Sequence, residues 1–242
     1  MTIRDLLYLA LIAIALLFEY FVVWRSFLRR SQVDPPRARS WLWSAWLILL
    51  WTLTAVGIAV WMFEGRAWAM LRLISPQGWR LWSSVALVLA VTIFGARTIF
   101  RIARRSGSRR IKLGNPHVER LSPHTGPELA WWVALSLSAG FCEEFIFRGY
   151  LIWAFQLPLG LWVSAALSVI VFALAHCYQG AKGVLATGIV GSFLTLVVLI
   201  FGSLWPAIVL HALIDIQQGL LAWLVFRRAE GEGTMVSAVQ AK

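Results

Sequence analysis

The sequence predicts an all-α fold, a polytopic integral membrane helical bundle with about seven transmembrane helices. Of its 242 residues, 60% are hydrophobic and 14% are charged, whereas soluble domains have about 25% charged residues. Long apolar stretches also recur along the chain, each sufficient for the ~20 residues with which a helix crosses a bilayer core. These observations exclude a disulfide-linked secreted domain, a disordered regulator and a soluble nucleic-acid-binding module.

Hydropathy places the expected membrane-spanning helices in order along the chain. The first apolar run is longer than that of a signal peptide and ends in bulky residues, so we interpret it as a retained span. An odd number of spans puts the two termini on opposite sides of the membrane. The seven predicted spans are residues 6–24, 41–62, 81–100, 130–156, 161–178, 183–202 and 204–226.

Basic connectors give the bundle its expected orientation. Five arginines lie between residues 25 and 39, and seven basic residues lie between 101 and 120. The positive-inside rule makes the side that carries these connectors cytoplasmic. We therefore expect an integral protein of the cell (plasma) membrane with its N-terminus outside and its C-terminus cytoplasmic. The net charge of +11 is then a topology signal, and no nucleic-acid partner is expected.

The connector 101–129 marks the expected functional boundary. It is basic and then rich in Gly and Pro, and it separates three plain spans from a C-terminal group that carries nearly all the intramembrane polarity. We predict an N-terminal three-span region with basic cytoplasmic connectors over 1–126, a functional region over 127–228 and a polar cytoplasmic tail over 229–242.

Ionisable residues concentrate in three of the C-terminal spans. At membrane depth each costs about 2.5–3.5 kcal/mol, so such residues persist mainly where they pair, line a wet cavity or perform chemistry. Glu19, near the cytoplasmic end of the first span, is instead expected to reach toward the membrane surface. The concentrated set is Glu143, Glu144 and Arg148 on one helix, Phe172 and His176 on the next, and His211 and Asp215 on the last.

Helical spacing separates the two neighbouring glutamates. Glu144 and Arg148 are four residues apart and share a face, so they are expected to pair. Glu143 then points from another face and is free to meet a reactant. Burial is expected to raise the proton affinity of Glu143, which suits this carboxylate to act as a general base or acid near neutral pH.

The same spacing relates the residues of the other two helices. Phe172 lies one turn before His176 and is expected to support its ring. His211 lies one turn before Asp215, which either orients the imidazole or reaches the reacting centre itself.

A depth argument brings Glu143 and His176 together. Both are equally far from the turn signal at 157–160, so two antiparallel helices joined there place them at one height. His211 follows the connector at Trp205 by only a few residues, which leaves it ~10 Å or more above them by simple threading. A broken or re-entrant entry near Trp205 would lower it.

The ordered motifs resemble the CPBP (CAAX protease and bacteriocin-processing, also called Abi) intramembrane proteases, which include the type II CAAX prenyl endopeptidases. The resemblance covers about 127–226 and implies that the functional region 127–228 is the catalytic domain. The motifs that carry it are Glu143-Glu144-x-x-x-Arg148, Phe172-x-x-x-His176 and His211-x-x-x-Asp215.

The resemblance implies hydrolysis of a peptide bond within or beside the membrane. Glu143 and His176 would activate a water, and His211 with Asp215 would stabilise the oxyanion, while Glu144, Arg148 and Phe172 support the site. The family's third motif ends in Asn or Asp, and this sequence has Asp215. The neutral amide that could stabilise an oxyanion is therefore replaced by a carboxylate. The expected partners are membrane lipid and a membrane-associated protein or peptide substrate of the CAAX-prenyl type.

The sequence leaves the need for a metal open. Glu143, His176 and His211 make a two-His, one-carboxylate ligand set with an open position, for which zinc is the most suitable divalent ion. They do not form the local His-Glu-x-x-His motif of soluble zinc proteases. A metal-free glutamate mechanism is the alternative.

Two other classes of function fit an intramembrane Glu/His cluster. A proton-coupled transporter would use these groups as a proton relay, although no inverted repeat is visible in the sequence. A non-catalytic immunity or assembly partner would keep the fold without the chemistry. The oligomeric state is open.

Overall fold

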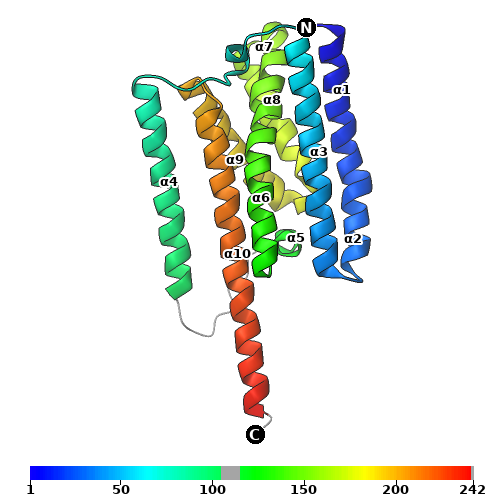
Figure 1. Cartoon of the computed structure of the whole chain (residues 1–242), viewed down its shortest axis with the longest axis vertical. Coiled ribbons are helices and arrows are strands. Elements are labelled where there is room, and N and C mark those ends of the chain that lie inside the picture. Colours follow the sequence, from blue (N-terminus) through cyan, green and yellow to red (C-terminus); the bar gives the residue numbers. More distant parts are fainter. Residues whose placement is uncertain (105–114, 241–242) are drawn as a thin grey trace.

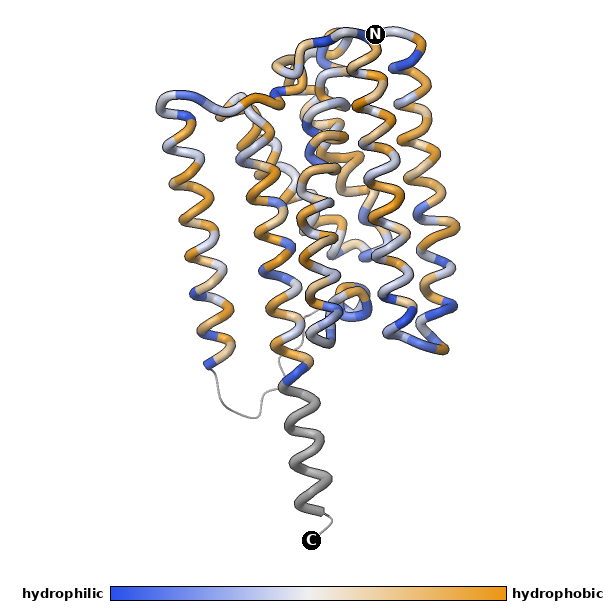
Figure 2. The backbone as a smooth tube through the Cα atoms, in the orientation of Figure 1, coloured by the Kyte–Doolittle hydropathy of each residue, from blue (hydrophilic) through white to orange (hydrophobic). Residues whose placement is uncertain are grey.

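The computed structural model describes residues 1–104 and 115–240, with side chains up to residue 227. These residues form helices and no strand, which confirms the predicted all-α bundle. Figure 1 shows long helices running side by side, with α4 at one edge of the bundle and α1 to α3 at the other. Figure 2 shows that their lengths are mainly apolar, while hydrophilic residues gather at the connecting turns.

The N-terminal region supplies three long helices. Asp34 caps the second of them by accepting a hydrogen bond from the Arg37 backbone N–H, and prolines occupy its first turn, where no intrahelical donor is lost. The elements are α1 (Ile3–Phe18), the π-helical η1 (Glu19–Trp24) and α2 (Arg25–Ser31) in continuous succession, then α3 (Pro35–Phe63), the short 3₁₀ helix η2 (Trp68–Leu71) and α4 (Trp79–Arg104).

The C-terminal region contains the helices that carry the predicted site. Thr125 and Glu128 form a capping box at the start of its first long helix. The elements are α5 (Pro116–Leu121), then α6 (Gly126–Glu143), the π-helical η3 (Glu144–Leu151) and α7 (Ile152–Leu159) in succession, followed by α8 (Leu161–Ala175), the 3₁₀ helix η4 (Cys177–Gln179), α9 (Gly180–Phe201) and α10 (Trp205–Gln240).

Six helices of the described chain are long and apolar enough to cross a membrane. The fifth predicted span corresponds to α8, which is apolar but has only 15 residues, because the helix ends three residues earlier than predicted. The six long helices are Ile3–Ser31, Pro35–Phe63, Trp79–Arg104, Gly126–Leu159, Cys177–Phe201 and Trp205–Arg227.

The turn between α7 and α8 lies at Gly160, as the turn signal predicts. Its φ of 76° belongs to a region that favours glycine. The turn reverses the chain, so α8 returns alongside η3, where the Ser168 hydroxyl donates a 2.7 Å hydrogen bond to the Phe147 carbonyl. This antiparallel pair positions two of the three predicted motifs.

Buried ion pairs fix the N-terminal helices against the C-terminal ones at both ends of the bundle. At one end Arg39 of α3 donates two hydrogen bonds to Glu128 of α6, at 3.0 and 2.7 Å. At the other, Arg66 donates to both oxygens of buried Asp5 in α1, at 2.7 and 2.8 Å, and Tyr150 of η3 donates to the same carboxylate. Helices α1 and α3 are therefore held as a wall beside the predicted site.

The N-terminus and the far end of α10 lie at opposite ends of the bundle (Figure 1). This arrangement agrees with an odd number of membrane crossings. Which end faces the cytoplasm stays a prediction from the basic connectors.

Candidate functional site

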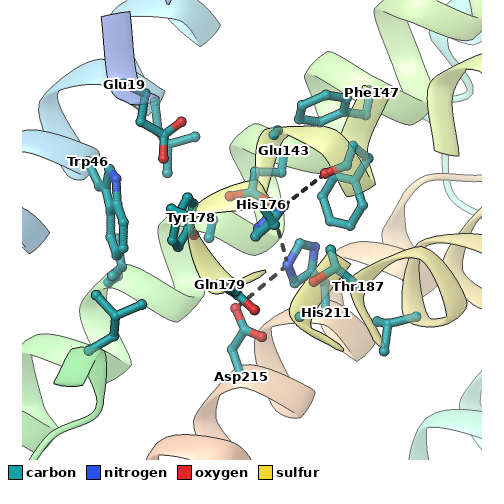
Figure 3. A pocket seen from close by; sticks show the side chains of 18 of the residues that line it. Glu19, Trp46, Glu143, Phe147, His176, Tyr178, Gln179, Thr187, His211 and Asp215 are labelled. Carbon is teal, nitrogen blue, oxygen red and sulfur yellow. Dashed lines mark hydrogen bonds and ion pairs between the residues drawn. The ribbon is translucent and has the colours of Figure 1, made fainter. Parts of the chain in front are cut away.

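A cavity of about 450 Å³ lies inside the bundle, between the N-terminal helices α1 and α3 and the C-terminal helices. Its walls are mainly apolar. The four polar residues predicted to perform catalysis all line it, and Figure 3 shows their side chains gathered on one side of the space: Glu143, His176, His211 and Asp215.

Buried Glu144 links two of the predicted motifs. Its Oε1 accepts a hydrogen bond from Arg148 Nη1 at 2.9 Å, which confirms the predicted pair. The same oxygen lies 2.8 Å from His211 Nδ1. Oε1 already accepts from Arg148, so we assign it as the acceptor here too, and Nδ1 carries the hydrogen of this bond. Glu144 thus orients His211, the role that the sequence offered to Asp215.

Arg148 is fully buried and is held by three elements. Its Nε donates to the Thr195 hydroxyl at 3.3 Å, and its Nη2 donates to the Gly191 carbonyl of α9 at 3.2 Å. Its guanidinium carbon lies 4.0 Å from the centre of the Phe172 ring, a cation–π contact. These contacts, together with the pair to Glu144, compensate the buried positive charge of Arg148.

Glu143 faces the cavity, as its helical position predicts. It is the last residue of α6 before the helix widens into η3. Its Oε2 lies 3.8 Å from His211 Nε2 and accepts no hydrogen bond from any described residue. This oxygen is therefore available to a bound reactant, consistent with the expected separation of the two glutamates.

His176 ends α8 instead of lying within a helix. Its φ and ψ are −97° and 18°, and its Nδ1 lies 2.8 Å from the Phe172 carbonyl oxygen. A carbonyl only accepts, so Nδ1 carries the hydrogen and the lone pair of neutral His176 is on Nε2. The Phe172 ring centre lies 4.9 Å from that of His176, in agreement with the predicted support.

His211 reaches the same depth as the other residues without the broken helix entry that the sequence suggested. Helix α10 runs unbroken from Trp205, and it begins below the tip of the α7–α8 hairpin (Figure 1). The preceding turn is anchored there, because Leu204 N–H donates to the Arg72 carbonyl at 2.8 Å and Ser203 donates to the Ile74 carbonyl. The predicted offset of His211, ~10 Å or more, was wrong. It assumed that the α7–α8 turn and the α9–α10 turn lie at the same height in the bundle.

Asp215 lies one turn beyond His211 on α10, with its Oδ2 3.6 Å from His211 Nε2. The indole N–H of Trp132 donates to the Asp215 carbonyl at 2.8 Å and fixes this part of α10 against α6. His211 Nε2 therefore faces two carboxylates, those of Glu143 and Asp215, at distances beyond a direct hydrogen bond.

The donor types at the site suit a divalent cation, but their arrangement is not that of a formed metal site. The described residues include no group of three His, Cys, Asp or Glu side chains placed to hold a metal ion. The hydrogen bond to Glu144 leaves Nε2 as the ligand atom of His211, and a carboxylate on the other ring nitrogen is usual for a metal-binding histidine. The zinc set expected at Glu143, His176 and His211 stays a prediction.

One carboxylate of the cavity was not included in the predicted site. Glu19, expected to reach the membrane surface, instead lines the cavity opposite the reaction centre (Figure 3). Its position inside an apolar span was the available signal, which the nearby basic residues of α2 obscured.

Residues 125–217 match the family model described as Rce1-like, type II CAAX prenyl endopeptidase. The matched segment contains all three predicted motifs, so this part of the chain is similar to the family that the motifs resemble. No curated protein and no solved structure matches the chain.

Proposed function

We propose that this chain, whose residues 125–217 match the Rce1-like, type II CAAX prenyl endopeptidase family model, hydrolyses a peptide bond of a membrane-associated protein through a water held by Glu143 and His176. One observation carries the proposal most directly. Three separate helical segments bring two free acceptors, Glu143 Oε2 and His176 Nε2, and an oriented imidazole, His211, to one apolar cavity.

The proposed reaction begins with deprotonation of the water. Glu143 takes one proton as the water oxygen attacks the carbonyl carbon of the substrate, while His176 Nε2 accepts a hydrogen bond from the other O–H and orients it. Glu143 then delivers its proton to the amide nitrogen as the C–N bond breaks. The products are a carboxylic acid and an amine, so atoms and charge balance.

His211 is proposed to stabilise the oxyanion of the tetrahedral intermediate. Because its Nδ1 donates to Glu144, Nε2 can donate only in the protonated ring. A cationic imidazole next to the carboxylates of Glu143 and Asp215 is favourable, and its N–H is a strong donor for a developing negative charge. Asp215 itself has no hydrogen to donate as a carboxylate, so its proposed role is to support His211.

The apolar cavity walls favour a lipid-linked or membrane-embedded substrate. The CAAX-prenyl type belongs to this class, and the aliphatic side chains of Leu49, Leu53, Leu135 and Ile146 line the space next to the polar site. We place the enzyme in the cell membrane with its N-terminus outside and its C-terminus cytoplasmic, as the basic connectors indicate.

Cleavage in proteoliposomes tests the proposal. Purified protein is mixed with a farnesylated, fluorescence-quenched peptide that ends in a CAAX sequence. Replacement of the base in Glu143→Gln is expected to lower kcat by about 10²–10⁴-fold, and His176→Gln by about 10²-fold or more. Glu64→Gln, which changes a carboxylate outside the cavity, is the matched control and should cleave as the wild type does.

The protein's melting temperature in detergent is measured for each variant to confirm that it is folded. Wild-type cleavage rates in both Glu143→Gln and His176→Gln would overturn the proposed mechanism.

A further inference from the structure

Glu19 is a cavity-lining carboxylate that the proposed reaction does not use. It is the first residue of the π-helical segment η1 and points into the cavity across from Glu143 (Figure 3). Such segments within α-helices occur frequently at functional sites. Residue 19 also lies outside the segment that matches the CAAX-protease family.

Glu19 has no ion-pair partner among the residues that the structure describes. The other acidic groups of this region do have basic neighbours: Glu144 contacts Arg148, and Glu143 and Asp215 face His211. A carboxylate at membrane depth is costly unless a cation or a set of hydrogen bonds compensates it.

Aromatic rings complete the wall around this carboxylate. Trp46 and Tyr178 both line the cavity, and their ring centres lie 5.4 Å apart with an interplanar angle of 37°. Figure 3 shows the Tyr178 ring between Glu19 and the catalytic group, with Trp46 on the other side of Tyr178 from His176. Aromatic faces next to a carboxylate are the combination that recognises an ammonium or guanidinium group.

We infer that Glu19, Trp46 and Tyr178 form a subsite for a cation carried on an apolar chain, such as the side chain of a substrate Lys or Arg. The Tyr178 ring centre lies 5.7 Å from that of His176, so the subsite borders the reaction centre. The cation would then belong to a residue close to the scissile bond. This last assignment rests on the proposed proteolysis, whereas the cation subsite itself does not.

Binding of small probes tests the subsite without any requirement for hydrolysis. Full-length protein in phosphatidylcholine nanodiscs is titrated with n-hexylammonium or n-hexanol by calorimetry, after subtraction of the heats from empty nanodiscs. Glu19→Gln, which keeps the shape of the side chain, is expected to bind n-hexylammonium about tenfold more weakly and n-hexanol unchanged. Equal affinity of the wild type and Glu19→Gln for the ammonium would overturn the subsite, as would equal losses for both probes.

Two further variants locate the cation within the cavity. Glu143→Gln removes the catalytic carboxylate and is expected to keep n-hexylammonium binding; loss of binding in this variant alone would place the cation at the reaction centre and overturn the assignment. Lys182 also lines the cavity and is exposed. Lys182→Gln is expected to keep or strengthen ammonium binding, because it removes a competing cation, and weaker binding would contradict the inference.

Competition identifies the source of the cation. A transmembrane peptide with a single Lys is expected to displace n-hexylammonium, whereas the same peptide with Met in place of Lys is not. Equal displacement by both peptides, or displacement only when phosphatidylethanolamine is added to the nanodiscs, would overturn the assignment to a substrate side chain. Because this readout measures binding, a failure of catalysis in the proteoliposome experiment leaves it intact.

Discussion

Glu144 and His211 lie 67 residues apart in the sequence, and Glu144 Oε1 is 2.8 Å from His211 Nδ1. Arg148 donates to the same oxygen at 2.9 Å. A buried ion pair thus also sets the orientation and tautomer of an imidazole in the proposed active site, as carboxylates do for histidines in catalytic triads and metal centres.

Loss of the Glu144 charge should destabilise the fold as well as the site. Glu144→Leu leaves Arg148 buried without its counter-ion, and the expected loss in unfolding free energy is about 3–5 kcal/mol. Arg148→Met leaves Glu144 uncompensated and should cost a similar amount. Chemical denaturation in mixed micelles measures both values.

The double variant Glu144→Leu/Arg148→Met is expected to be more stable than either single variant, because neither charge remains unpaired. It should still lack cleavage activity, because nothing orients His211. Additive destabilisation in the double variant would show that the two charges do not depend on each other.

Asp215 is expected to act through His211 rather than on the substrate. Asp215→Asn keeps the shape of the side chain but removes the negative charge that favours the cationic His211, so it should lower kcat about 10²-fold, as Asp215→Leu should. Steady-state cleavage of the farnesylated peptide gives both values. Cleavage by Asp215→Asn at nearly the wild-type rate would show that the negative charge is not required.

Chelation should leave cleavage unchanged. The described residues include no group of three side chains placed to hold a metal ion, and the proposed reaction activates the water with Glu143 and His176 alone. Activity is measured before and after dialysis against 1,10-phenanthroline, together with the metal content of the purified protein. Stoichiometric zinc, with activity lost on chelation and restored by zinc, would instead establish the zinc site that the ligand types suggested.

Glu64, outside the membrane-spanning helices, should make the fold sensitive to acid. The hydrogen bond from Arg4 lowers the pKa of Glu64 below its usual value of 4.5, and Thr2 and Arg66 act in the same direction. A carboxyl group whose pKa is lower in the folded protein stabilises the fold above its unfolded pKa, and this contribution is lost as the pH falls through the folded pKa.

The melting temperature should therefore fall less steeply below pH 4.5 in Glu64→Gln than in the wild type. Thermal denaturation followed from neutral pH to about pH 3 compares the two proteins. Identical pH profiles would show that the hydrogen bond with Arg4 contributes nothing in solution.

Local rules were sufficient where the relevant contacts lie close in the sequence. The spacing of Glu144 and Arg148 predicted their ion pair, and the turn signal at 157–160 predicted the turn at Gly160 between α7 and α8. Both follow from helix geometry and from the conformational preference of glycine. The Glu144–His211 bond follows no such rule, because it depends on how deeply the α9–α10 turn is anchored by the carbonyls of Arg72 and Ile74.

By itself the sequence determined that the chain is an apolar helical bundle and which polar residues occupy its spans, since composition and helical period are properties of the chain alone. Only the tertiary structure decided that Glu144 orients His211 and that Glu19 faces the cavity. Helical period fixes the angle at which a side chain leaves its own helix, whereas its partner depends on the relative height and rotation of neighbouring helices, which long-range packing sets.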